Sequence, residues 1–329
     1  MKSNWAGFQS GAASALDRYI AYKRALRRRF CNEERQLRLL DRFLLDRTVE
    51  RIEDIQPELI DAFLASRPRR RTRSYNHLLG VVRCFFDWLV TQGLLSQSPV
   101  SATPRRETDC RIPFLFNPAQ ARRLLEVANH LPDRNGAPLR GTTYYTIFAL
   151  LYGLGLRVGE VSRLCWKDVD RERQLLVIRE TKFSKSRLVP FGPRLAAVIV
   201  QYMQRRAQPG GVLPPDAPLF CFRKGQPVSA GTISQTFHQL WPRLGFTLPP
   251  GVAPPRVHDL RHAFAVGTLL RWYREGIDPS TRLLHLSTFL GHVNPDSTAV
   301  YLTITAELFQ EANRRFEQLV APAITEVRR

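Results

Sequence analysis

The fold is decided most clearly by residues 258–301, HDLRHAFAVGTLLRWYREGIDPSTRLLHLSTFLGHVNPDSTAVY. Apolar residues recur there every three or four positions, which predicts helices over 258–275 and 280–290. A third, short helix is expected from 297 to about 302. Histidine, arginine and tyrosine side chains stand close to the ends of these segments. The stretch therefore predicts a helical scaffold that carries several polar, chemically active groups.

The sequence before this stretch adds more helices and one hairpin. Helical patterns cover residues 118–130, 142–152, 193–206 and 230–240, and a short helix is expected from Val158. Two segments, QLLVIRE at 174–180 and RLVPF at 187–191, are typical of strands joined by a turn. The expected fold class is therefore mainly α with a small antiparallel β-sheet.

The N-terminal part has a different organisation. Four helices are predicted between residues 14 and 93: 15–30, a second around 37–44, 57–64 and a fourth around 78–89. Three prolines and no apolar period occur in 96–113, which is typical of a linker. We therefore predict a helical domain over 1–95, a linker over 96–113 and a second domain over 114–329, which ends with an amphipathic helix at 306–320.

The charge balance favours a polyanionic partner. The chain has 329 residues, with 49 Lys and Arg against 29 Asp and Glu, a formal net charge of +20. Lys and Arg are in excess on both sides of Pro113, so both domains are expected to touch the polyanion. Arg69, Arg70, Arg71 and Arg73 form a dense patch that we predict to contact DNA phosphates. The alternative is a basic surface that only keeps the protein in solution.

Several other classes of protein are disfavoured. No stretch approaches the roughly 20 apolar residues of a membrane span, and the N-terminus lacks the apolar core of a secretory signal. The five cysteines form no zinc-binding pattern. We expect a cytoplasmic, nucleoid-associated bacterial protein without a cofactor, since there is neither an ATP-binding loop motif nor a convincing acidic metal site.

Five short patterns, far apart in the sequence, require one explanation. They are GLRVGE at 155–160, Lys182 in the hairpin turn, HDLRH at 258–262, LGH at 290–292, and Tyr301. Each is weak alone, but the ordered set, with nine residues from His292 to Tyr301, is specific. Together they resemble the catalytic domain of the tyrosine recombinases, also called the phage integrase family. The resemblance covers about 114–329, and the N-terminal segment is similar in kind to the family's helical core-binding domain.

The resemblance implies that Tyr301 is the nucleophile, which becomes joined to a 3′ phosphate of DNA. The phosphorus centre gains negative charge during attack, and the planar forks of Arg157 and Arg261 can hold its oxygens. Tyrosine has an ordinary pKa of about 10, so a base is needed near it. His258 lies three residues before Arg261, on the same helix face, and by resemblance it assists proton transfer. By resemblance too, His292 donates a hydrogen bond to the phosphate.

The leaving 5′ oxygen needs a proton, and Lys182 resembles the family's general acid. Lys185 is the rival. Lys182 is preferred because the turn TKFSKSR resembles the GKGxKxR turn of XerC and XerD, in which the first lysine acts, with Phe183 in place of a glycine. Glu160, one helical turn after Arg157, is expected to support that arginine. His262 should point about 100 degrees away from Arg261 on the helix, so we interpret it as structural.

The implied partners are duplex DNA sites and other copies of the chain. We expect the N-terminal DNA-binding domain and the catalytic domain to form a two-domain clamp around duplex DNA. By resemblance, the helix at 306–320 docks on a neighbouring protomer in a tetramer on DNA, and accessory recombinases could take part. The step of 31 positions from Arg261 to His292 exceeds the spacing of XerC and XerD and favours a transposon-borne branch. Integration, excision or transposition of a mobile element is the expected role. The alternatives are a type IB topoisomerase and a DNA-binding regulator without catalysis.

Overall fold

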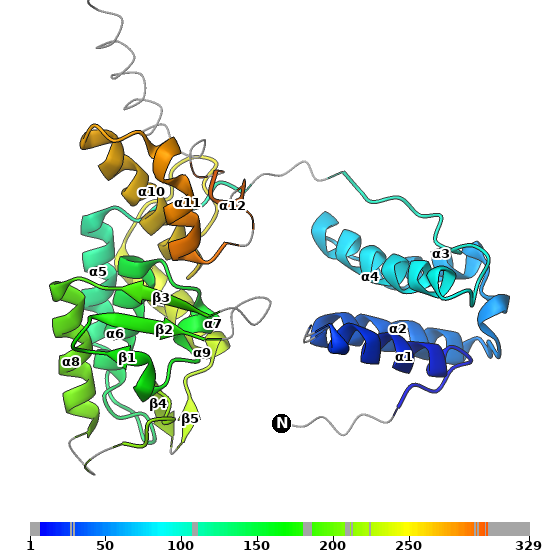
Figure 1. The fold of residues 1–329 in the computed structure, drawn as a ribbon, viewed down its shortest axis with the longest axis horizontal. Helices are drawn as coiled ribbons and strands as arrows, with labels where there is room; N and C mark the ends of the chain where they lie inside the picture. The colour runs from blue at the N-terminus through cyan, green and yellow to red at the C-terminus, as the bar shows by residue number, and fades with distance from the viewer. Residues whose placement is uncertain are drawn as a thin grey trace, which may run out of the picture. The chain divides into compact units, whose positions relative to one another are not determined.

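A computed structural model shows two compact units, Met1–Cys110 and Arg111–Arg329, which are described separately (Figure 1). The residues described are 7–26, 28, 30–106, 111–179, 186–207, 211, 213–223, 225–292, 294, 296–299 and 301. The division between the units falls within the stretch 96–113, which is rich in proline.

The first unit is helical. Its helices are α1 (Ala13–Ala25), α2 (Cys31–Asp46), the short η1 (Ile52–Asp54), α3 (Pro57–Ser66) and α4 (Thr72–Thr91). The first helix ends earlier than predicted, because Phe30 has a left-handed φ of 50° and precedes α2. The ring of Tyr19 packs edge-on against Phe30 and Phe85, with ring centroids 5.6 and 5.4 Å apart. These aromatic contacts join α1, α2 and α4 around one core.

The second unit is mainly helical with two small antiparallel sheets. Its helices are α5 (Pro118–Asn129), α6 (Arg140–Leu154), α7 (Val158–Val161), η2 (Trp166–Asp168), α8 (Pro193–Ala207), α9 (Ala230–Leu240), η4 (Trp241–Leu244), α10 (Asp259–Arg274), α11 (Pro279–Leu290) and α12 (Asp296–Ala299). Helix α6 packs against α5, α8 and α10. Buried residues occur all around α6, as expected for a helix at the centre of a core.

The predicted hairpin is present as two shorter strands, β2 (Leu175–Ile178) and β3 (Arg187–Pro190), which pair antiparallel. A third strand, β1 (Val169–Asp170), joins the other side of β2. A separate two-stranded sheet consists of β4 (Cys221–Arg223) and β5 (Gln226–Pro227). Sequence analysis missed β1, β4 and β5, because strands of two or three residues are too short to show alternation.

Helices α10, α11 and α12 carry the residues of 258–301 to one place in this unit. Buried apolar residues of α10 and α11 form a cluster that includes Tyr301. Helix α10 contacts α6, and α11 contacts β3. The predicted short helix is observed at Asp296–Ala299, so Tyr301 lies just beyond its end. The predicted helix at 306–320 lies outside the described residues. Among the described residues, no helix is long and apolar enough to span a membrane.

Candidate active site

Arg157 stands at the turn between α6 and α7, as the residue that precedes the first turn of α7. The turn depends on Gly155, which has a φ of 58°. A Cβ atom on Gly155 would lie 2.6 Å from Cδ1 of Phe264 and 2.9 Å from Cδ2 of Leu290. Only glycine fits here, and its small size lets the end of α6 approach α10 and α11.

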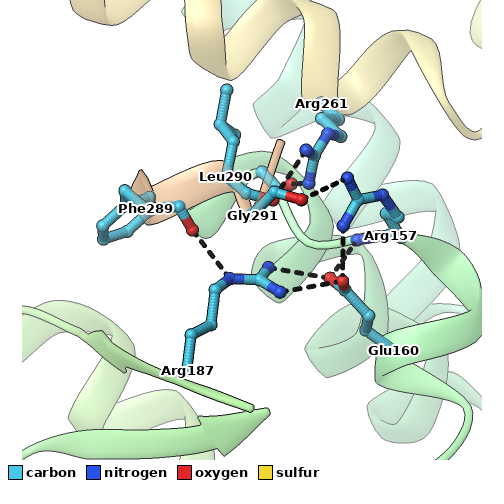
Figure 2. Close-up of polar contacts among 8 residues, drawn as sticks. Arg157, Glu160, Arg187, Arg261, Phe289, Leu290 and Gly291 are labelled. Atoms are coloured by element: carbon cyan, nitrogen blue, oxygen red, sulfur yellow. Dashed lines mark hydrogen bonds and ion pairs between the residues drawn. The ribbon is translucent and has the colours of Figure 1, made fainter. Parts of the chain in front are cut away.

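Glu160 is a buried carboxylate that holds two arginines (Figure 2). It accepts hydrogen bonds from the backbone nitrogen and from Nη1 of Arg157, at 2.9 and 2.8 Å. Arg187 donates Nη1 and Nη2 to the two carboxylate oxygens, each at 2.9 Å. Burial alone raises the pKa of Glu160, but the hydrogen bonds and charge of Arg187, and then those of Arg157, hold it at about 2. The ionised carboxylate therefore fixes both guanidinium groups.

Arg187, the first residue of β3, is a site residue that the sequence analysis did not identify. Besides its bonds to Glu160, it donates Nε to the carbonyl oxygen of Phe289 at 2.9 Å. It approaches Gly291 so closely that a Cβ there would lie 2.8 Å from Nη1 of Arg187. The arginine that ends the turn pattern TKFSKSR was the available signal. Arg187 thus joins the small sheet to the end of α11.

Arg261 and Arg157 both reach the end of α11 (Figure 2). Arg261, only 1% exposed, donates Nη1 to the carbonyl of Gly155 at 2.6 Å and Nη2 to that of Leu290 at 2.7 Å. Arg157 donates Nη2 to the carbonyl of Gly291 at 2.8 Å. The last carbonyls of a helix lack partners within the helix and suit such donors. Burial, and then the charge of Arg157, lowers the pKa of Arg261 to about 10, so it stays protonated at neutral pH.

Three histidines surround this pair of arginines. Burial, with the charge of Arg261 adding to it, lowers the pKa of His262 and of His292 to about 4. The pKa of His258 is also lowered, by desolvation of its ring and then by the charges of His262 and Arg261, although this side chain reaches solvent at the start of α10. His292 is fixed by a 2.7 Å hydrogen bond between its Nδ1 and Oγ1 of Thr298. At neutral pH the imidazoles of His262 and His292 are uncharged, so each has one donor and one acceptor nitrogen.

Tyr301 is buried, with only 3% of its surface exposed, and its hydroxyl faces His262. Nδ1 of His262 lies 3.1 Å from Oη of Tyr301. The ring of His292 stacks at 6.3 Å from the tyrosine ring. Burial raises the pKa of Tyr301 above its ordinary value, and the charge of Arg261 offsets part of this effect.

The sequence interpretation of His262 as a structural residue did not foresee this hydrogen bond. A helical wheel gave the direction in which His262 leaves α10, but not the segment that packs on that side. Tyr301, which follows α12 in the sequence, lies on that side. His258, the predicted proton acceptor, instead packs edge-on against His262 at 4.8 Å between ring centroids.

Five of the six predicted catalytic residues lie in the described part of the chain. These five are close to one another, where α6, α10 and α11 meet. They are Arg157, His258, Arg261, His292 and Tyr301. Lys182 and its rival Lys185 lie outside the described residues. No group of three or more His, Cys, Asp or Glu side chains that could hold a metal ion occurs in the described part of the chain.

The predicted DNA-contact arginines lie in the first unit, around the start of α4. Arg70, Arg71 and Arg73 are exposed. Arg69 is partly buried and donates Nη2 to Oε1 of Gln36 at 3.0 Å. Three of the four are therefore accessible to a polyanion.

The site combines fixed positive charge with a hydroxyl group. Two guanidinium groups bind one carboxylate, and backbone carbonyls hold a third guanidinium group, that of Arg261. This leaves excess positive charge beside a tyrosine and neutral histidines. Such a site can bind a phosphodiester and bring a nucleophile to it. The fold and the site therefore indicate a class of protein that acts on phosphodiesters.

Comparisons with known proteins give the family. The model of the phage integrase family matches residues 115–307, more than half of the chain. The chain is 38% identical over 307 residues to y4rB of Sinorhizobium fredii, a protein named as an integrase/recombinase. The aligned region covers 92% of this chain and 96% of that relative. The chain belongs to the phage integrase family, the tyrosine recombinases, which cleave and rejoin DNA strands.

Solved structures show the same fold. The Tn1549 transposon integrase in complex with transposon right-end DNA has a TM-score of 0.65 at 16% identity, over 95% of this chain and 100% of that one. A lambda integrase tetramer bound to a Holliday junction has a TM-score of 0.59 at 19% identity, over 86% and 77% of the two chains. The fold class predicted from the sequence is confirmed.

Proposed function

We propose that this chain is the recombinase of a mobile element, and that it exchanges DNA strands through a covalent bond between Tyr301 and a 3′ phosphate. The observation that carries the proposal is the meeting of Arg157, Arg261 and Tyr301 at the end of α11. The two arginines are already fixed by carbonyl groups, so they can bind a phosphate without first being ordered.

In the proposed reaction, the oxygen of Tyr301 forms a bond to phosphorus and the bond to the 5′ oxygen breaks. Arg157 and Arg261 stabilise the charge on the nonbridging oxygens, and His292 donates a hydrogen bond to one of them. Lys182 gives a proton to the leaving 5′ oxygen. The phosphotyrosine bond keeps the energy of the broken diester, so rejoining to a new 5′ hydroxyl requires neither ATP nor metal.

The proposed partner is duplex DNA, with contacts from the basic surface of each unit. The exposed arginines before α4 support contacts from the first unit, and the excess charge of the site supports contacts from the second. The names of the transposon integrase and of the lambda integrase tetramer, each bound to DNA, support transposition or integration by a DNA-bound tetramer.

Trapping the covalent intermediate tests this function. The wild-type protein is incubated with a nicked suicide substrate that carries the ends of its element, in the presence of EDTA. We expect a protein–DNA adduct with the wild type and none with Tyr301→Phe, which keeps the buried ring but lacks the nucleophile. A DNA-binding regulator would give no adduct with either protein. Transfer of the trapped strand to a second site separates a recombinase from a topoisomerase, which only relaxes supercoiled DNA.

Removal of the C-terminal segment tests the proposed assembly. If the predicted helix at 306–320 docks on a neighbouring protomer, a protein truncated after Thr305 should bind one site normally and lose most recombination between two sites. Binding is measured by gel shift and recombination by product formation. Normal recombination by the truncated protein contradicts the proposed docking.

A further inference from the structure

The hydroxyl of Tyr301 must lose a proton when it attacks phosphorus, so the group that touches it is decisive. Nδ1 of His262 lies 3.1 Å from Oη of Tyr301, within hydrogen-bond distance. The two rings pack edge-on, with centroids 5.4 Å apart. His258, which the resemblance assigns to proton transfer, contacts the ring of His262. His262 is therefore placed directly on the reacting atom.

The charges around this contact favour an uncharged His262. Titratable or charged groups face the His262–Tyr301 pair from α10, from the segments before it and from the other elements of the site: His258, Arg261, Arg256, Arg111, Arg157 and His292. Burial, and then the charges of Arg256, Arg261 and Arg111, lowers the pKa of His262 to about 4, so its imidazole is uncharged at neutral pH. A neutral imidazole with its hydrogen on Nε2 has a free lone pair on Nδ1.

We propose that His262, rather than His258, accepts the proton of Tyr301 during DNA cleavage. The inference rests on the proposed function, in which Tyr301 is the nucleophile. The O–H bond of Tyr301 breaks and its proton moves to Nδ1 of His262. The tyrosine oxygen forms the bond to phosphorus, while the bond to the 5′ oxygen breaks and that oxygen takes a proton from the general acid. In the rejoining step the protonated His262 returns the proton to the tyrosine oxygen.

Proton acceptance and simple packing make different predictions for His262→Asn. The asparagine oxygen can replace Nδ1 as a hydrogen-bond acceptor, so it keeps Tyr301 in place, but it cannot take up a proton. A packing residue would therefore tolerate the change. A base would not, and its loss commonly lowers a rate by about 10² to 10⁴.

The experiment measures single-turnover cleavage of the nicked suicide substrate between pH 6 and 9. We expect His262→Asn to cleave about 10² to 10⁴ times more slowly than wild type at pH 7. The cleavage rate of His262→Asn should rise by about tenfold per pH unit, because without a proton acceptor Tyr301 must lose its proton to solvent before it attacks. The wild-type rate should stay nearly constant over this range. His285→Asn, an exposed change on α11, is the matched control and should behave as wild type.

A modified substrate separates the two sides of the reaction. Sulfur in place of the bridging 5′ oxygen leaves without a proton, so it relieves the loss of a general acid but not of a base. The deficit of His262→Asn should persist on this substrate. His262→Gln provides a second test if His262→Asn fails to bind DNA or to fold.

Three results would overturn the inference: cleavage within threefold of wild type, disappearance of the deficit with the sulfur substrate, or the steep pH dependence appearing in His258→Asn instead. Failure of the proposed function is separate, because it would remove the Tyr301-dependent adduct from the wild-type protein.

Discussion

Arg157→Lys is expected to be nearly as inactive as Arg157→Ala in DNA cleavage. The guanidinium group of Arg157 makes two bonds in different directions, with Nη1 to Glu160 and Nη2 to the carbonyl of Gly291, both at 2.8 Å. A single ammonium group cannot bridge both partners and still offer a planar fork to phosphate. Loss of one fixed donor to a transition-state oxygen costs about 10² to 10³ in rate. We therefore expect both variants to fall by at least that factor.

The measurement is single-turnover adduct formation on the suicide substrate, with DNA affinity measured in parallel. Arg157→Lys keeps its charge, so its affinity for DNA should stay close to that of wild type. Arg173→Lys, at a side chain that is 81% exposed, is the matched control. Cleavage by Arg157→Lys within tenfold of wild type would show that charge alone, and not the fork, is needed.

Long helices of the fold could be predicted from the sequence because their apolar periodicity is repeated over several turns. The ends of helices were harder to predict, and helix α6 shows why. It is buried on all sides, so its ends are set by neighbouring elements and not by apolar periodicity. Its last turn ends at Gly155, where α10 and α11 leave room for no side chain. The short strands β4 and β5 are likewise defined by pairing, which residues of one segment do not encode.

The catalytic residue types could be predicted in the same way, because the chemistry restricts them, but their contacts could not. Arg187 and His262 were missed as site residues. Each is held by a segment distant in sequence: Arg187 by Glu160 and α11, and His262 by Tyr301. A sequence gives the direction of a side chain on its own helix or strand, whereas a hydrogen bond between distant segments requires the tertiary fold.

Glu160→Gln is expected to lower the free energy of unfolding by about 3 kcal/mol at pH 7. The pKa of Glu160 is about 2 in the folded protein against an ordinary value of 4.5, and each pKa unit corresponds to about 1.4 kcal/mol. Because the folded pKa is depressed, this stability is fully present above about pH 4.5 and is lost as the pH falls through about 2. The neutral glutamine lacks it at every pH, and leaves Arg157 and Arg187 without a counter-charge.

Urea unfolding of both proteins at a series of pH values measures this effect. The difference in free energy of unfolding should be constant from pH 7 to about 5 and then shrink as the wild type loses its advantage. Glu172→Gln, an exposed change in the turn between β1 and β2, should leave stability unchanged within about 0.5 kcal/mol. If the two proteins differ in free energy of unfolding by the same amount at pH 7 and at pH 3, Glu160 stabilises the fold through its packing and not through its charge. The carboxylate of Glu160 fixes both Arg157, which precedes α7, and Arg187, which begins β3. If stability is lost only when this carboxylate is protonated or replaced, its charge both orders the arginines of the site and joins β3 to α7.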